Sequence, residues 1–250
     1  MRKVRVYQQE HLYAGQVLIA TPATSHHLLK VLRLKVGHPV EVFNGHLAFH
    51  SVIVATHKCV HLELRQSVQY QSAYGLSIHL ALACIKPDPF DTFLQKATEL
   101  GVQQITPLCT ELTHMQVSAK KMRVRYPHWS KTIIHACEQS GRYDIPHLHP
   151  LAYFSAFTEA YVHRPVLKLI CHPYRQHPQN VADLLSALHD QSEVVVLIGP
   201  EGGFSAREVA IAMDASFLPI QIAANILRAD TAALAIMSLL GYYQHRFVPA

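Results

Sequence analysis

The stretch 199–203, with the sequence GPEGG, is the part of the chain best suited to holding a small molecule. It follows the apolar run 194–198, which predicts a buried strand, and it precedes Ser205 and Glu208, whose spacing is that of a helix capping box. In an open α/β sheet, ligands bind beyond the carboxyl ends of the strands, and glycines let a ligand approach the main chain closely. The sequence therefore predicts a ligand loop, with an ordinary tight strand-to-helix turn as the alternative.

The chemistry of this loop argues against a polyphosphate ligand. No lysine follows it, as a phosphate-binding G-x-x-x-x-G-K-[ST] loop requires, and the chain contains no G-x-G-x-x-G fingerprint. The loop offers backbone amides and the single acid Glu201, without a cation. A nucleotide-dependent oxidoreductase is therefore disfavoured.

Neither the histidines nor the cysteines are spaced as metal ligands. The 19 histidines are scattered without an H-E-x-x-H motif, and the five cysteines form no C-x-x-C pair. An odd number of unpaired cysteines favours reduced thiols, and no stretch of 18 apolar residues predicts a membrane span. We expect a cytoplasmic protein with no structural metal and no membrane segment.

The excess positive charge lies in the first third of the chain. Residues 1–75 hold eight Lys or Arg and three Asp or Glu, whereas residues 76–250 hold fourteen of each. This asymmetry favours contact between the first third and a polyanion such as nucleic acid, although a basic domain with no such partner would have the same composition.

The first 70 residues alternate between short β-type runs and turn signals, a pattern typical of a small β-barrel or sandwich. One helix is predicted within residues 24–37, with Ser25 as its N-cap. Residues 66–76 are polar and small and suit a linker. The predicted strands are 4–8, 16–20, 39–44, 48–56 and 60–65.

From residue 76 onward, predicted strands alternate with predicted helices, which indicates a parallel sheet covered by helices on both faces. The first helix has Asp88 as N-cap, Pro89 at its first position and Gly101 at its end. The predicted strands are 76–85, 102–109, 166–172, 193–199 and 217–223, and the predicted helices are 88–101, 128–141, 180–190, 205–214 and 230–244.

The last predicted helix is apolar on every face across residues 231–243. A helix of this kind is expected to be buried all round. Its cover is either a second subunit or the rest of its own domain.

Six stretches occur in the order found in one protein family. The sequence resembles the ribosomal RNA small subunit methyltransferase E family of the SPOUT superfamily, and the resemblance covers nearly the whole chain. The combination of GPEGG with the later ILRADTA is its most specific part. The stretches are 1–7, 26–45, 95–108, 137–146, 197–209 and 226–234.

The resemblance implies a fold and an activity. The fold is α/β, with a PUA-like RNA-binding β-barrel in residues 1–70 and a SPOUT methyltransferase domain in residues 74–250, which has a mostly parallel sheet and a deep trefoil knot. The implied protein is a homodimer that uses S-adenosylmethionine to methylate N3 of a uridine in 16S rRNA of the small ribosomal subunit.

The resemblance also implies site residues. One cofactor loop is Gly199, Pro200, Glu201, Gly202 and Gly203. A second lies within 222–231 and comprises Ile222, Ala223, Asn225, Ile226 and Leu227, with Ile226 and Leu227 against the adenine. A third wall follows the strand at 166–171, near Cys171 and His172.

The acceptor atom requires activation, because uridine N3 carries a proton at neutral pH. Catalysis needs a proton acceptor and a group that holds the charge spreading onto the carbonyl oxygens. The catalytic candidates are Arg228 for charge stabilisation, Asp230 as base or helix N-cap, and Thr231. The candidates for gripping RNA are Arg2, Arg5, Lys30, Arg33, Lys35 and Arg142.

The chain departs from the family pattern in the second loop. Residues 222–225 read Ile-Ala-Ala-Asn where the family has Leu-Gly-x-Arg, and Asp230 replaces a glutamate. Ala223 in place of glycine costs roughly 1 kcal/mol or more if the backbone there has positive φ. Two alternatives therefore stay open: a related knotted methyltransferase acting on another RNA, and a non-catalytic RNA-binding relative.

Overall fold

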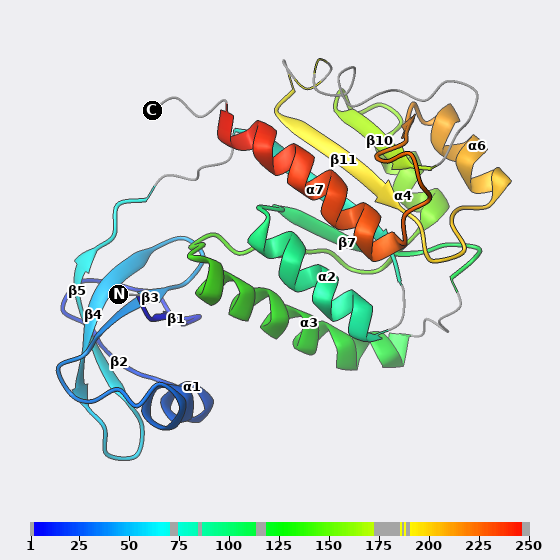
Figure 1. Ribbon diagram of the computed structural model, residues 1–250. Coiled ribbons are helices and arrows are strands. Elements are labelled where there is room, and N and C mark those ends of the chain that lie inside the picture. The colour runs from blue at the N-terminus through cyan, green and yellow to red at the C-terminus, as the bar shows by residue number, and fades with distance from the viewer. Residues whose placement is uncertain are drawn as a thin grey trace. The chain divides into compact units, whose positions relative to one another are not determined.

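The computed structural model describes residues 3–70, 75–84, 87–113, 119–172, 186, 188 and 191–246 (Figure 1). The chain divides into two compact units. Unit 1 comprises Met1–Ser72 and Ile134–Ile145, and unit 2 comprises Ala73–Ile133 and Pro146–Ala250. The segment 134–145, which the sequence assigned to the second domain, thus makes its contacts with the first.

Unit 1 is built on a five-stranded sheet in the order β1-β3-β4-β5-β2. The β1–β3 pair is parallel and the others are antiparallel. Alternating apolar side chains, among them Val42, Ile53, Leu62 and Leu64, form a continuous core. The five predicted strands are confirmed as β1 (Arg5–Tyr7), β2 (Val17–Ile19), β3 (Pro39–Phe43), β4 (Ala48–Ala55) and β5 (His61–Ser67).

The helical segment of unit 1 begins earlier than predicted. Helix α1 (Pro22–His26) is capped by Thr21, whose hydroxyl accepts the amide of Thr24, and a π-helical turn η1 (His27–Val31) follows. Ser25 as N-cap was wrong, because its buried hydroxyl donates to the carbonyl of Ala20 and accepts the Val60 amide. The Thr-Pro pair at 21–22 is the start signal that the sequence reading missed.

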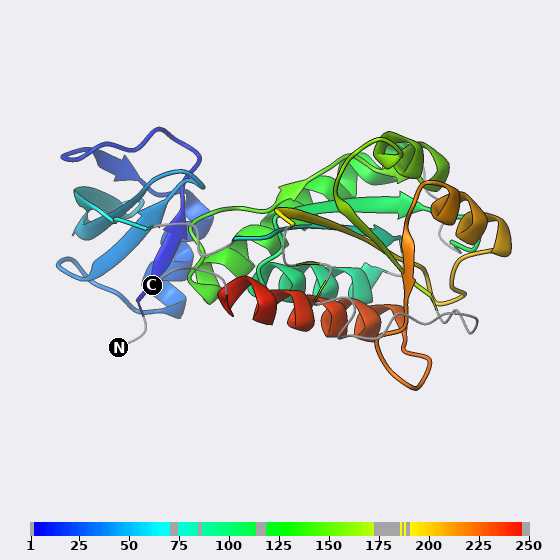
Figure 2. The ribbon, with the colours of Figure 1, turned by 90° about the horizontal axis from the view of Figure 1, so that it is seen from above.

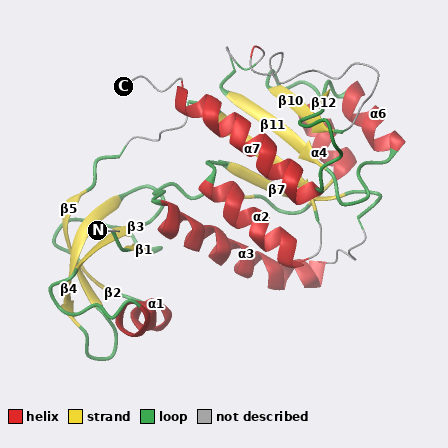
Figure 3. Cartoon of the chain, viewed as in Figure 1, coloured by secondary structure: helices red, strands yellow, loops and turns green. Residues whose placement is uncertain are grey.

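Unit 2 is built on a seven-stranded sheet in which every described ladder is parallel (Figure 3). The order is β12-β10-β11-β6-β7-β8, with β9 also beside β7. The central strands are buried on both faces, as expected for parallel strands rich in Val, Ile and Leu. The strands are β6 (Ser77–Ala83), β7 (Gln104–Cys109), β8 (His147–Leu148), β9 (Ala152–Tyr153), β10 (Leu167–Cys171), β11 (Glu193–Ile198) and β12 (Leu218–Ile220).

Helices cover both faces of this sheet, as predicted (Figure 2). Helices α4 (Phe154–Tyr161) and α6 (Ala206–Asp214) pack on one face in a cluster with Val195 and Leu197 of β11. Helices α2 (Pro87–Glu99) and α7 (Ala229–Arg246) pack together on the other. Helix α3 (Ala119–Ser140) joins α2 through the ring contact of Trp129 with Phe90.

Several predicted boundaries of unit 2 need correction. Helix α2 begins at Pro87, so Asp88 lies inside it and is not its N-cap. Helix α3 begins at Ala119, nine residues before the predicted start, and continues through Pro127. Proline lacks an amide donor and usually marks a helix start, which explains the misplaced boundary.

Other elements were missed or cannot be compared. Helix α4 and the two-residue strands β8 and β9 were not predicted. The predicted helix 180–190 falls outside the described residues, apart from residues 186 and 188. Among the helices that are described, none is both long and apolar enough to cross a bilayer.

Candidate active site

The carboxyl ends of β10, β11 and β12 lie at one edge of the sheet, because the three strands are parallel neighbours. The segments that leave these ends are 171–172, 199–205 and 221–228. They are the three walls that the sequence assigned to a cofactor site. This edge is where open α/β sheets bind ligands.

The first loop, 199–203, is a tight turn with little room for side chains. The Gly203 amide donates to the Pro200 carbonyl at 2.8 Å, and Gly203 has a φ of +72°. A Cβ on Gly199 would lie 3.1 Å from the Gly203 carbonyl carbon, whereas one on Gly202 would make an ordinary 3.5 Å contact with Leu112. Gly199 and Gly203 are therefore required by the turn itself.

The predicted capping box at the start of α6 is confirmed. The Glu208 amide donates to Ser205 Oγ at 3.1 Å, and Glu208 Oε2 accepts the Ser205 amide at 3.0 Å. The second carboxylate oxygen, Oε1, accepts the Glu111 amide at 2.8 Å. Glu208, only 2% exposed, thus ties the segment after β7 to the end of the first loop, a link that the sequence did not reveal.

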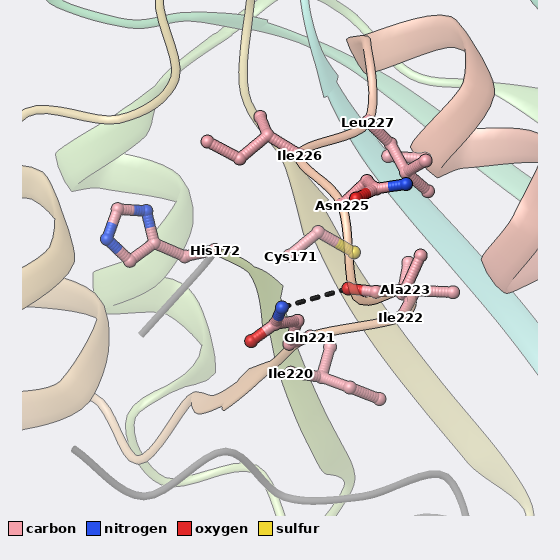
Figure 4. Close-up of a pocket in the computed structure, with 10 residues that line it drawn as sticks. Cys171, His172, Ile220, Gln221, Ile222, Ala223, Asn225, Ile226 and Leu227 are labelled. Atoms are coloured by element: carbon pink, nitrogen blue, oxygen red, sulfur yellow. Dashed lines mark hydrogen bonds between the residues drawn. The ribbon is translucent and has the colours of Figure 1, made fainter. Parts of the chain in front are cut away.

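The second loop and the third wall enclose a small pocket of about 70 Å³ at the ends of β10 and β12 (Figure 4). All five residues predicted for the second loop contribute to it. The first loop does not line it. The lining residues are Cys171, His172, Ile220, Gln221, Ile222, Ala223, Asn225, Ile226, Leu227 and Ala232.

The second loop is braced from within and is unstrained at the altered position. Gln221, which the sequence reading missed, donates its side-chain amide to the Ala223 carbonyl at 2.9 Å (Figure 4). Within the described chain, positive φ at non-glycine residues occurs at Arg33 and Ser216. Ala223 therefore does not carry the conformational cost that a positive φ would impose on an alanine. Ile226 projects outward and is 84% exposed, which leaves a large apolar side chain uncovered beside the pocket.

The two polar residues of the third wall are held uncharged. Burial raises the pKa of the Cys171 thiol to about 12, so it is not a thiolate near neutral pH. Desolvation lowers the pKa of His172 below its ordinary value. His172 is thus a neutral imidazole that can accept a hydrogen bond or a proton.

The three predicted catalytic residues lie together at the start of α7, between the pocket residues Leu227 and Ala232. Arg228 Nε is 3.5 Å from Asp230 Oδ1, with the two side chains 73% and 35% exposed. The same oxygen accepts the Thr231 amide at 2.8 Å. Because α7 begins at Ala229, Asp230 lies in its first turn and is not its N-cap.

The predicted RNA-gripping residues do not form one group. Lys30, Arg33 and Lys35 are exposed, and no salt bridge between described residues involves them. Arg142 is buried and pairs with Asp144. Arg2 falls outside the described residues.

Arg5 is likewise engaged inside unit 1, where Glu41 is a shared partner. Arg5 Nε lies 3.1 Å from Glu41 Oε2, Lys3 Nζ lies 2.8 Å from Oε1, and Tyr143 Oη donates to Oε2 at 2.8 Å. Burial alone would raise the pKa of Glu41, but the hydrogen bonds from Lys3 and Tyr143 and the charge of Arg5 lower it overall. Arg5 thereby helps to hold the segment 134–145 against β3.

A second pocket, of about 340 Å³, lies beside the start of α6. Its lining includes Cys109, Glu111, Tyr153 and Arg207, from the ends of β7 and β9 and the start of α6. Among the described residues, no group of three or more His, Cys, Asp or Glu side chains is placed to hold a metal ion.

Two family models match the chain. The model of the RNA methyltransferase domain matches residues 73–241, and the model of the RNA methyltransferase PUA domain matches residues 20–64. Ribosomal RNA small subunit methyltransferase E of Synechocystis sp. is 29% identical over 227 residues, which are 91% of this chain and 73% of that protein. The protein of the same name from Buchnera aphidicola (subsp. Schizaphis graminum) is 27% identical over 239 residues, 94% of each chain.

Two solved structures are similar over almost the whole chain. One, from Legionella pneumophila, is described as a methyltransferase in complex with the bound cofactor SAM; it has 33% identity and a TM-score of 0.87, over 97% of this chain and 98% of that one. The other is a ribosomal RNA small subunit methyltransferase E of Neisseria gonorrhoeae bound to S-adenosyl methionine. It has 28% identity and a TM-score of 0.85, over 95% and 96% of the two chains.

Proposed function

Because the chain belongs to the RNA methyltransferase family, we propose that it transfers the methyl group of S-adenosylmethionine to N3 of a uridine in 16S rRNA of the small ribosomal subunit. Relatives that match over most of the chain carry the name ribosomal RNA small subunit methyltransferase E, which confirms the family resemblance. The observation that carries the proposal is the pocket between the second loop and the third wall, at the sheet edge that binds ligands in this class of fold.

The residues of this pocket fit the adenosine part of the cofactor. Exposed Ile226 and neighbouring Leu227 offer an apolar surface for a flat base, and the backbone of 221–227 offers amides and carbonyls for its polar edge. S-adenosylmethionine, when bound, supplies a methyl group on a sulfonium leaving group, so the transfer needs no metal. The pocket is smaller than the roughly 300 Å³ usual for small-molecule sites, so we propose that the second loop moves outward on binding.

One residue of the pocket, His172, and one next to its lining, Asp230, are suited to take the N3 proton. Asp230 presents a carboxylate at the start of α7, and His172 presents a neutral imidazole from the third wall. The Arg228 guanidinium, mostly exposed and next to the pocket, would stabilise the negative charge that develops on the uridine carbonyl oxygens. Because N3 lies on the pairing edge, the target base must be unpaired or flipped out.

Exposed cations of unit 1 would hold the RNA. Lys30, Arg33 and Lys35 are placed for phosphate contacts, whereas Arg5 and Arg142 serve internal pairs. Of the predicted RNA-gripping residues, we therefore assign RNA contact to these three.

The finer features of the fold and assembly are also proposals. We propose, from the family resemblance, that unit 2 contains a trefoil knot. We further propose that the sheet of unit 1 closes into a barrel, and that the protein acts in the cytoplasm, where ribosomes are assembled.

A homodimer is proposed from the outward side of α7. Tyr242 is 64% exposed there, and Ala235 and Leu239 are only half-buried. This apolar stripe at helical spacing suits a second copy of the chain. Sedimentation of Tyr242→Glu as a monomer, beside a dimeric parent protein, would support this interface.

The activity is tested with labelled S-adenosylmethionine and small ribosomal subunits that lack uridine N3 methylation. We expect N3-methyluridine, identified by mass, and none from a folded Arg228→Ala variant. Label on a different nucleoside would support a related methyltransferase with another target. Absence of both incorporation and cofactor binding would support a non-catalytic RNA-binding relative.

A further inference from the structure

A second cationic region lies in unit 2, although positive and negative residues are equal in number over residues 76–250. Residues 112–137 contain five Lys or Arg and no Asp or Glu. Four of these cations have described side chains, all on α3: Lys121, Arg123, Arg125 and Lys131. Lys121 is engaged in an interaction, which leaves the other three as candidates for contact with a ligand. Arg123 and Lys131 are exposed, and Arg125 is half-buried.

These three side chains differ from the other described cations of unit 2. No salt bridge between described residues involves Arg123, Arg125 or Lys131. The others are all engaged: Lys96 with Glu99, Arg164 with Glu193, Arg207 with Glu111, Arg228 with Asp230, and Lys168 with the carbonyls of Tyr161 and Val162. The positive charge of Arg123, Arg125 and Lys131 is therefore not neutralised by other described residues and is available to an external anion.

The position of α3 suits a substrate that approaches the candidate site. Burial raises the pKa of the Cys84 thiol to about 12, and Arg125 is close enough to oppose that shift. Cys84 follows β6, next to β11 in the sheet, so Arg125 lies at the carboxyl edge that carries the first loop. Figure 1 shows the N-terminal end of α3 on the side toward which the β11 arrow points.

We infer that Arg123 and Lys131 of α3, which lie about 80° apart around the helix, form a phosphate-binding face for the RNA substrate, in addition to the cations of unit 1. The inference rests on the proposed function for its choice of an RNA partner. Arg123 and Lys131 are eight residues apart, about 12 Å along the helix, so the face can contact more than one phosphate. Contacts of this kind add affinity and orientation without reading sequence.

The test compares two double variants that remove the same number of charges from unit 2. Arg123→Gln/Lys131→Gln removes two unpaired cations, and Lys96→Gln/Arg164→Gln removes two paired ones. Glutamine keeps a helix propensity close to that of Arg and Lys. Binding to small ribosomal subunits is measured between about 50 and 200 mM salt, the range over which phosphate contacts change affinity strongly.

We expect the α3 variant to bind roughly tenfold more weakly at low salt, with a log–log salt slope smaller by about 1.4, or about 0.7 for each contact to a single-stranded phosphate. The control should keep the parent slope, and both variants should bind S-adenosylmethionine normally. Arg125→Gln, at a half-buried position on the other side of the helix from Arg123, should change the slope less than the α3 double variant does. Equal slopes for the two double variants, or no binding of the parent protein to RNA, would overturn the inference.

Methyl transfer is measured separately in the same samples. A parent protein that binds subunits with the expected salt dependence but transfers no methyl group would contradict the proposed function and leave the phosphate-binding face standing. Unchanged RNA binding in the α3 variant, with normal methyl transfer, would contradict the phosphate-binding face and leave the proposed function standing.

Discussion

Two substitutions in the first loop can distinguish a structural role of this loop from a ligand-binding role. Gly199→Ala places a methyl 3.1 Å from backbone, which must shift, at a cost of about 1–3 kcal/mol. Gly202→Ala adds the same methyl in an ordinary contact with Leu112 and is the matched control. We expect calorimetry to give about tenfold weaker S-adenosylmethionine binding for Gly199→Ala, equal to 1.4 kcal/mol, and near-normal binding for Gly202→Ala.

Two other outcomes for cofactor binding by these variants would contradict this expectation. Normal cofactor binding by Gly199→Ala, in a protein of lowered stability, would mean that the loop is only a strand-to-helix turn. Weak binding by Gly202→Ala alone would instead mean that the ligand approaches Gly202 directly.

At the residue scale, sequence reading was reliable for spacing and unreliable for pairing. The capping box of Ser205 and Glu208 is local, so four consecutive residues of sequence were enough to predict it. The partner of Arg5 is Glu41, 36 positions away, and no local pattern reveals such an ion pair. The tie from Glu208 to Glu111 spans 97 positions and was missed for the same reason.

The tie made by Glu208 connects two elements, the segment after β7 and the start of α6. Glu208→Ala removes the acceptor for two backbone amides, those of Ser205 and Glu111. We expect a loss of about 2–3 kcal/mol in the free energy of unfolding, because hydrogen bonds to a charged group are among the stronger ones. Cofactor affinity should fall as well, since the first loop ends at Ser205.

Urea unfolding and calorimetry check this expectation against Glu159→Ala, which truncates an exposed glutamate of α4. Glu208→Gln keeps one acceptor oxygen and should fall between the parent protein and Glu208→Ala in both measurements. If Glu208→Ala loses stability but binds the cofactor normally, the tie supports the fold alone.

Elements with a strong periodic pattern were predictable, and short or interrupted ones were not. The apolar runs of β6, β10 and β11 and the helix signals between them indicated a parallel sheet, because buried parallel strands have few alternatives. Strands β8 and β9 have two residues each, too few for any pattern. Helix α3 continues through Pro127, held by the packing of Trp129 on Phe90.

At the scale of the whole molecule, the net charge of each part of the sequence does not show which cations are paired within the fold. Residues 76–250 have equal numbers of positive and negative residues, yet most described cations of unit 2 are used in internal pairs while Arg123, Arg125 and Lys131 are not. In unit 1, Arg5 is likewise used internally, while Lys30, Arg33 and Lys35 remain exposed. Charge counts alone favoured nucleic-acid contact in the first third and could not single out the unpaired cations of α3.

The stability of unit 2 should depend on pH through one buried histidine. His79 on β6, 3% exposed, hydrogen-bonds Tyr161 Oη of α4 through Nδ1 and Thr106 Oγ1 of β7 through Nε2, both at 2.7 Å. Burial, followed by the charges of His149, Arg164 and His147, lowers its pKa from 6.5 to about 3. The folded protein therefore keeps His79 neutral at pH values where the unfolded chain binds a proton.

The direction of this pH dependence follows from the difference in proton binding between the folded and unfolded states. Above pH 6.5 neither state protonates His79, so its contribution to stability is fully present; as pH falls from 6.5 toward 3, the unfolded state alone gains a proton and stability is lost. At pH 5 the loss from this residue is about 2 kcal/mol. The fluorescence of Trp129, the only tryptophan of the chain and buried in unit 2, reports the urea unfolding of that unit at pH 7.5 and 5.

We expect His79→Gln to be less stable than the parent protein at pH 7.5, because it loses part of the hydrogen bonding, but to lose about 2 kcal/mol less than the parent between pH 7.5 and 5. His163→Gln, at an exposed position of the same unit, should keep the parent pH dependence. An identical pH dependence in all three proteins would assign the acid sensitivity of unit 2 to other groups. His149 and His172, whose pKa values burial also lowers, would then be the next histidines to replace.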